Sequence, residues 1–421
     1  MKILLKRAFL LPLLFASGAV MAQSSLTVWM TDSRPGYKKW LESEAGTFMS
    51  QNPDIKVNIV QMSPNDAYLK LPAAAAAGGL PDVIWTTYGI APWVDGMKGG
   101  KLADVDAIID ELGRDKFDED ALKQWSYQGR SACLPVARTP TYLIYRADLF
   151  EKAGLEAPKD WDEVIAAAEK LNDPAAGKYG IVLPGKTDFS PRFAYGLILY
   201  SMGGTTFDAA GQPAFESPES IRALDIYKKL YQYSPPGSLN FGFSEIQRVL
   251  AQGRAAMTIS NPSSMATFAR TNKEEGATLA LALPGPVKRT IQNQRGWCIL
   301  DTPQVQDAKK FVTQLYSTSS FFTYLDAASI SSFPVYHAPE AYQKFAQTNE
   351  TVQRFPHAVE FIGAHTVGTM PGVDGTGLTV DSGKLISSGQ IESAVNKMLA
   401  NDLSPEDTAK MIQSETLRVL N

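Results

Sequence analysis

The sequence predicts an α/β protein of two lobes with a ligand cleft between them. Short segments with strand periodicity alternate with helical segments, and this alternation favours sheets covered by helices. The alternation resumes after residue 145, which indicates a second unit of the same kind. The length agrees, because 421 residues less a predicted leader of 22 suit two domains.

The first 22 residues have the features of a secretory signal peptide. A basic start (MKILLKR) precedes an apolar run at residues 8–15, and small residues lead to a cleavage site after Ala22. The apolar run is much shorter than the ~20 residues that a membrane-spanning helix needs. No cysteine follows the run, so no lipid attachment is expected. We therefore predict an exported protein that works in a bacterial periplasm.

The first unit is predicted to have three strands and two helices. In chain order these are a strand at 26–30, an amphipathic helix at 37–50, a strand at 55–61, an alanine-rich helix at 69–77 and a strand at 82–85. Gly78-Gly79 ends the second helix, because glycine favours the turn that closes a helix. Such an order predicts a parallel sheet.

The second unit repeats the pattern. Its predicted elements are helices at 161–171, 193–202, 220–233 and about 307–318, and strands at 179–183, 255–260 and 296–300. Asp160 is the expected N-cap of the first of these helices, with acidic residues in the turn that follows. The rest of the chain is expected to be mostly helical and rich in loops.

Charge and histidine content exclude several classes of partner. Removal of residues 1–22 takes away three basic residues and no acids, so the formal charge falls from −4 to −7. This argues against nucleic acid or anionic membrane as a partner. His337, His357 and His365 lack metal-ligand spacing, so we predict no metal and no cofactor.

Cys133 and Cys298 are the two cysteines of the chain. In an oxidising compartment they could form a disulfide, but nothing in the sequence places them together. Two buried free thiols are the alternative, and the sequence leaves both open.

Motifs for catalysis are weak in this sequence. Residues 180–187 (GIVLPGKT) match the phosphate-loop pattern by letter, but the four residues between the glycines are themselves a predicted strand. We interpret this as a chance match. GxSxG and HExxH are absent, although a pair of catalytic carboxylates needs no local spacing. We predict no catalytic residues.

Aromatic residues stand at or near the ends of predicted strands, with polar residues beside them. Trp29 precedes TDSR, Trp85 precedes TTY, and Trp297 lies in the strand GWCIL. In open α/β sheets ligands bind beyond the carboxyl ends of strands. Aromatic rings with polar neighbours suit the C–H faces and hydroxyls of a sugar, whereas any single tryptophan is more often part of the core.

With these residues in view, the chain resembles the extracellular solute-binding proteins of ABC sugar importers, the maltose-binding-protein class. The resemblance covers nearly all of the chain after the leader. It depends on ordered segments, which are LTVWMTDSR, NPDIKVNI, AAAAAGGLPDVIW, LPVARTPTYLIYRADLFEKAGLEAPKDWDEVIAAAEKL, VLAQGRAAMTISNPSSM, RGWCIL and FPVY. PDVIW and the YRADLFEKAGL segment are the most specific.

The resemblance implies the type II periplasmic-binding-protein fold, in which hinge strands join two lobes that close over a ligand. It places the N-terminal lobe at 23–138 plus 293–325 and the C-terminal lobe at 139–292 plus 326–421. It also implies a monomer that binds a small carbohydrate and then docks on the permease subunits of the transporter.

The same resemblance assigns ligand-binding positions. These are Trp29, Thr31, Asp32, Arg34, Thr86, Thr87, Tyr88, Arg138, Thr139, Arg192, Tyr195, Asn261, Ser263 and Trp297.

Two positions depart from the family pattern. The family often has GPW or GxW where this chain has Asn261-Pro262-Ser263, and its hinge often has Asp, Glu or Thr near Arg138. Because arginine pairs well with anions, we considered an acidic, phosphorylated or sulfonated sugar or glycoside as ligand. In the alternative arrangement, Arg138 pairs with Asp32 or another acid and never meets the ligand.

We therefore predict a periplasmic substrate-binding protein of an ABC transporter that binds a carbohydrate by lobe closure and is not an enzyme. The alternative from another class is a secreted glycan-active lyase or hydrolase. A binding protein for a non-sugar, such as a polyamine or a glycerol phosphodiester, also stays open, because a fold does not determine its ligand.

Overall fold

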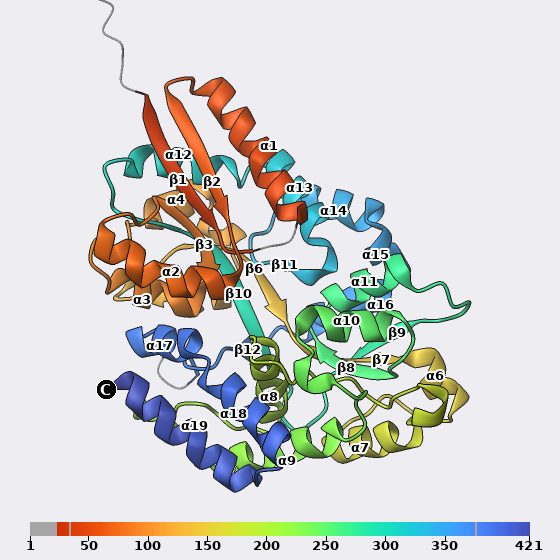
Figure 1. Cartoon of the computed structure of the whole chain (residues 1–421). Helices are drawn as coiled ribbons and strands as arrows, with labels where there is room; N and C mark the ends of the chain where they lie inside the picture. Colours follow the sequence, from red (N-terminus) through yellow and green to blue (C-terminus); the bar gives the residue numbers. More distant parts are fainter. Residues whose placement is uncertain (1–22, 33–34, 375–376) are drawn as a thin grey trace, which may run out of the picture.

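The computed structural model describes residues 23–32, 35–374 and 377–421. The predicted signal peptide and Arg34 lie outside these residues. Within the described chain, a seven-stranded central sheet and a three-stranded second sheet organise two halves of the molecule. Figure 1 shows the central sheet in the upper half, and β7, β8 and β9 of the second sheet in the lower half.

The central sheet has the strand order β11-β6-β10-β3-β1-β2, and β12 pairs with β10 beside this path. Its strands are β1 (Ser24–Met30), β2 (Ile55–Gln61), β3 (Val83–Thr87), β6 (Leu134–Pro140), β10 (Thr290–Ile299), β11 (Phe333–Pro334) and β12 (Gly368–Thr369). β1 pairs in parallel with β2 and β3, as the β-α-β order predicts. β10 is antiparallel to both β3 and β6.

The second sheet corrects part of the sequence interpretation. It consists of β8 (Met257–Ser260), β7 (Tyr142–Arg146) and β9 (Leu279–Ala282), and both of its strand pairs are antiparallel. Residues 179–183, predicted as a strand, form only isolated parallel bridges, from Tyr179 to Ala255 and from Val182 to Thr258. Alternating strands and helices therefore predicted the layers of this half but not the direction of its strands.

Helices cover both sheets. They are α1 (Pro35–Gln51), α2 (Pro64–Ala77), η1 (Tyr88–Ile90), α3 (Ala91–Asp95), α4 (Asp106–Leu112), η2 (Arg114–Lys116), α5 (Glu119–Gln124), α6 (Ala147–Lys152), α7 (Trp161–Lys170), η3 (Pro174–Ala176), α8 (Ser190–Ser201), α9 (Pro218–Tyr231), η4 (Ser238–Asn240), α10 (Phe243–Ala251), α11 (Ser263–Thr271), α12 (Val305–Gln314), α13 (Thr318–Ala328), η5 (Ser329–Ser331), α14 (Pro339–Thr348), α15 (Glu350–Arg354), α16 (Pro356–Ala364), α17 (Val380–Ser388), α18 (Gln390–Asn401) and α19 (Pro405–Leu420). A short hairpin, β4 (Ser126–Tyr127) with β5 (Arg130–Ser131), precedes β6.

The predicted helix boundaries follow from local chemistry. Asp160 caps α7 by accepting a hydrogen bond from the backbone N–H of Glu163 at 2.9 Å, as predicted. α2 ends at Gly78, whose φ of 69° lies in the left-handed region that glycine adopts readily. α2 begins five residues earlier than predicted, because Ser63 is its N-cap and Pro64 fits the first turn.

Two chain segments cross side by side between the halves. β6 belongs to the central sheet, β7 belongs to the second sheet, and Thr141 alone separates them. The backbone N–H of Thr141 donates to the carbonyl of Ile291 at 2.9 Å, so the start of β10 runs beside this crossing. Figure 1 shows β10 extending from the upper half toward the lower half. This arrangement agrees with hinge strands at these positions, while the exact lobe boundaries stay a prediction.

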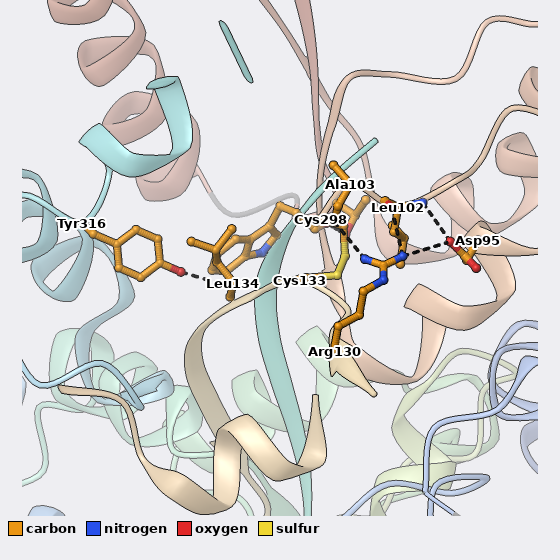
Figure 2. The surroundings of a disulfide bond; sticks show 10 residues. Asp95, Leu102, Ala103, Arg130, Cys133, Leu134, Cys298 and Tyr316 are labelled. Atoms are coloured by element: carbon orange, nitrogen blue, oxygen red, sulfur yellow. Dashed lines mark hydrogen bonds and ion pairs between the residues drawn. A yellow bond between two sulfur atoms is a disulfide. The ribbon is translucent and has the colours of Figure 1, made fainter. Parts of the chain in front are cut away.

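Cys133 and Cys298 form a disulfide, which decides between the two alternatives that the sequence leaves open. Cys133 directly precedes β6 and Cys298 lies in β10, so the bond joins these two strands at the end away from the second sheet. Figure 2 shows the surroundings, where the Arg130 guanidinium donates to the carbonyls of Ala103 and Leu102 at 3.1 and 3.0 Å.

Candidate functional site

A cleft of about 470 Å³ lies between the two halves and is lined by both. Its volume falls in the ~300–1,000 Å³ range of small-molecule sites. Its lining includes Asp32, Asn65, Tyr68 and Thr87 from the first half, Thr139, Thr141, Asn293 and Arg295 from the crossing segments, and Phe189, Arg192, Phe193, Phe243, Gln247, Asn261, Ser263, Arg270 and Ile386 from the second half.

Six of the sequence-predicted site residues line this cleft. They are Asp32, Thr87, Thr139, Arg192, Asn261 and Ser263. The turn before α11 explains the last two, because the Asn261 side chain accepts hydrogen bonds from the backbone N–H and hydroxyl of Ser263 at 3.0 and 2.6 Å. Gln247 donates to the Ser263 hydroxyl at 2.7 Å, which links α10 to the same corner. The MTISNPSS segment therefore supplies polar groups to the cleft without a tryptophan.

The predicted aromatic platforms lie in the core instead. Trp297 is 1% exposed and Trp29 9% exposed, and the rings of Trp85 and Trp297 are 4.8 Å apart. Trp85 and Trp297 are register partners on β3 and β10, and Tyr324 of α13 packs over that face. On β3 it is Thr87, the last residue of the strand, that lines the cleft.

The remaining predicted positions in this region are also buried away from the cleft. Thr31 donates its hydroxyl to the carbonyl of Trp85 at 2.5 Å. The Tyr195 hydroxyl lies 2.7 Å from that of Ser220. Thr86 and Tyr88 are buried as well. These four residues are not among those that line the cleft in the described chain.

Arg138 has the alternative arrangement considered from the sequence. Its guanidinium forms an ion pair with Asp118, which also lies 2.6 Å from Nε2 of His337. Neighbouring residues of a strand point to opposite faces, so Thr139 lines the cleft while Arg138 lines a separate pocket with Phe333. The acid therefore offsets the burial of Arg138.

Arg192 is the buried cation of the cleft. Nη2 of Arg192 lies 3.2 Å from a carboxylate oxygen of Glu392, and Nη1 donates to the carbonyl of Ile386 at 2.7 Å. Burial raises the pKa of Glu392, and the Arg192 charge opposes that shift. Nε of Arg192 has no hydrogen-bond partner among the described residues.

Polar atoms of the first half and the crossing strands are also buried and unpaired at this site. The hydroxyl of Thr87 and the side-chain oxygen of Asn293 have no hydrogen-bond partner in the described part of the chain. Buried polar groups normally have partners, so such atoms in a cleft indicate positions that a ligand satisfies.

Sequence reasoning missed the aromatic wall of the cleft. Phe189 lies 5.9 Å from Phe193 and 5.5 Å from Phe243, measured between ring centroids, and Tyr68 lines the cleft from α2. The rings come from the start of α8 and the start of α10 rather than from strand ends. The spacing of Phe189 and Phe193, four residues apart at a helix start, is the sequence signal that could have revealed them.

The phosphate-loop match at residues 180–187 has no loop of free amides. The backbone N–H groups of Gly185 and Lys186 both donate to the carbonyl of Phe241 at 3.1 Å. A Cβ atom on Gly180 would lie 1.8 Å from the carbonyl oxygen of Ala168, so this glycine serves close packing. The match is a coincidence of letters, as predicted.

Within the described ranges, 23–32, 35–374 and 377–421, the helices are too short or too polar to span a bilayer. No group of three or more metal-ligating side chains gathers within the same residues.

Comparison with known proteins identifies the family of the chain. The sequence model of the bacterial extracellular solute-binding proteins matches residues 31–320, more than half of the chain. The chain is 30% identical over 223 residues to the mannitol-binding protein of Pseudomonas aeruginosa PAO1, with 50% of this chain and 49% of that protein covered. It spans about half the length of the first curated relatives that it matches.

Two solved structures share the architecture. An ABC transporter solute-binding protein of Agrobacterium radiobacter K84, in complex with ribitol, gives a TM-score of 0.78 at 22% identity and covers 95% of this chain and 99% of its own. A solute-binding protein of Thermotoga lettingae TMO, bound with α-D-tagatose, gives 0.76 at 23% identity and covers 94% and 100%. The predicted two-lobed α/β fold is thereby confirmed. The chain belongs to the family of bacterial extracellular solute-binding proteins.

Proposed function

We propose that this protein is the substrate-binding component of an ABC importer and captures a sugar or polyol in the cleft between its halves. The observation that carries the proposal is the composition of the cleft. Thr87, Asn293 and Arg192 line a site that also contains phenylalanine rings, and each has a buried polar atom without a hydrogen-bond partner in the described part of the chain. Sugar hydroxyls can hydrogen-bond with the polar side chains, and the C–H face of a sugar packs on the phenylalanine rings.

The residues have distinct roles in this proposal. Thr139, Asn261 and Ser263 add hydrogen-bonding groups from the crossing strand and the second half. Asp32 and Arg295 add a carboxylate and a guanidinium. The halves close over the ligand, and the segments at residues 138–142 and 290–294 absorb the motion.

The charge of the cleft supports a neutral ligand. Asp118 neutralises Arg138 outside the cleft, and Glu392 neutralises Arg192. Asp32 and Arg295 line the cleft with opposite charges, and Arg270 is exposed. Arg138, which suggested an acidic, phosphorylated or sulfonated sugar, is neutralised by Asp118 and gives little support to that choice, which stays a prediction.

The cellular setting follows from the same proposal. The protein is exported by its predicted signal peptide, works as a periplasmic monomer without a cofactor, and delivers its ligand to permease subunits. Its lobes are residues 23–138 plus 293–325 and 139–292 plus 326–421.

A thermal-shift screen tests the proposal. The panel contains D-mannitol, ribitol, D-tagatose, maltose, D-glucuronate and D-glucose 6-phosphate. A ligand at ~100 times its Kd should add roughly 2.7 kcal/mol to the free energy of unfolding. We expect a shift from at least one neutral compound, and no shift from any compound would contradict the proposal.

Variants connect that shift to the cleft. Asn293→Ala should weaken binding of the active compound at least tenfold, because it removes a buried polar partner, whereas Asn401→Ala on the exposed end of α18 should leave it unchanged.

Oligosaccharides incubated with the protein should be recovered intact on chromatography. Released products would instead support the glycan-active enzyme.

A further inference from the structure

Arg192 and Glu392 form an ion pair that is almost completely buried. Both side chains are 5% exposed, and they come from different helices, α8 and α18. A buried ion pair often stabilises a fold no better than apolar residues of similar volume. Its presence therefore needs an explanation other than stability.

The pair is asymmetric with respect to the cleft. Arg192 lines the cleft, whereas Glu392 lies behind it and is not among the lining residues of the described chain. Glu392 holds Nη2 and the carbonyl of Ile386 holds Nη1, so two of the three guanidinium nitrogens are occupied. Nε is buried and has no hydrogen-bond partner among the described residues.

The second partner connects this arrangement to the other half of the molecule. Ile386 belongs to α17, which packs against α3 and η1 of the first half, and its side chain also lines the cleft. Arg192 is therefore fixed by groups from α17 and α18 together. A guanidinium held on two sides loses little freedom when a ligand binds beside it.

We propose that Glu392 is a positioning and specificity-determining residue: it fixes the Arg192 side chain in the wall of the cleft, and it cancels the Arg192 charge so that the cleft prefers uncharged polyols to anionic ones. The inference rests on the proposed function. Glu392 thereby sets the selectivity although it is not among the described residues that line the cleft.

Glu392→Gln tests the charge role. The variant keeps the size of the side chain but leaves Arg192 uncompensated, so the cleft gains one positive charge. We expect affinity for D-mannitol to fall about tenfold and the ratio of D-gluconate to D-mannitol affinity to rise at least tenfold, both measured by calorimetry. Glu406→Gln, an equal change of charge on the exposed start of α19, should alter neither quantity.

A second variant separates orientation from charge. Arg192→Lys keeps the charge but lacks the planar fork that Glu392 and the carbonyl of Ile386 hold, so D-mannitol affinity should fall while the preference for neutral ligands persists. If Glu392→Gln does not fold, Arg192→Gln/Glu392→Gln removes both buried charges. That pair should bind D-mannitol at least tenfold more weakly without gaining affinity for D-gluconate.

The outcomes distinguish this inference from the proposed function. A wild-type protein that binds none of the sugars or polyols tested overturns the proposed function and, with it, the inference. A wild-type protein that binds them while Glu392→Gln keeps the same affinities and the same selectivity overturns the inference alone.

Discussion

Asp374 is a buried carboxyl group whose protonation is coupled to folding. It accepts hydrogen bonds from the backbone and hydroxyl of Thr206, and from the backbone N–H of Gly372 at 3.1 Å. Burial nevertheless raises the pKa of Asp374 from 3.8 to about 6. The folded protein therefore binds this proton more tightly than the unfolded chain does.

This shift predicts a specific dependence of stability on pH. A raised pKa in the folded state contributes stability that is complete below pH 3.8 and is lost as the pH rises through about 6. At ~1.4 kcal/mol per pKa unit the loss is up to about 3 kcal/mol. Asp374→Asn should lack it, so urea unfolding at pH 4, 5, 6 and 7 should give a flatter profile than the wild type.

The control for this prediction is Asp54→Asn, which changes an exposed carboxyl group in the turn before β2. It should follow the wild-type profile. Parallel profiles for the wild type and Asp374→Asn would show that the proton on Asp374 is not coupled to folding.

At the scale of elements, the disulfide joins β6 and β10 at the end of the sheet away from the crossing segments. It closes a loop across a sequence separation of 165 residues. Cys133→Ala/Cys298→Ala should therefore lower the free energy of unfolding by about 2–5 kcal/mol. Because neither cysteine lines the cleft, sugar affinity should change little.

Urea unfolding with and without a reductant measures this contribution. Reductant should destabilise the wild type and leave the double variant unaffected. An equal response of both proteins, or a double variant as stable as the wild type, would contradict the prediction.

Elements were more predictable from the sequence than the site was. The strand Ile55–Gln61 agrees with its predicted bounds, because its alternation of polar and apolar residues is local information. Trp297 is a predicted ligand-binding residue that lies in the core. Nothing local in the sequence reveals that α1 and α13, which are distant in the chain, cover its face of the sheet. Arg138 was equally undecidable, since its partner Asp118 lies on a different segment.

At the scale of the molecule, α17 of the second half packs against α3 and η1 of the first. A Cβ atom on Gly383 would lie 2.2 Å from Cβ of Trp93 in α3, so the glycine permits this approach. Gly383→Ala should push α17 away from α3 and, through Ile386 and Arg192, disturb the cleft wall.

We expect Gly383→Ala to cost about 1–3 kcal/mol of stability through overpacking. It should also weaken the binding of the active sugar about tenfold, measured by calorimetry. Gly363→Ala on α16 is the matched control, because among the described residues nothing lies within 4 Å of the added methyl group. Unchanged affinity in Gly383→Ala would show that α17 docking does not govern the cleft.

The position of β10 has a consequence for the order in which the molecule can be assembled. β10 lies between β3 and β6, yet the whole second sheet, from Tyr142 to Ala282, precedes it in the chain. β3 therefore keeps an open edge until residues 290–299 arrive. Pairings so distant in sequence slow folding, because loop-closure entropy is lost before the contact forms. A chain with this strand order stays unfolded for longer, and an unfolded chain can pass through a narrow protein-conducting channel in a membrane.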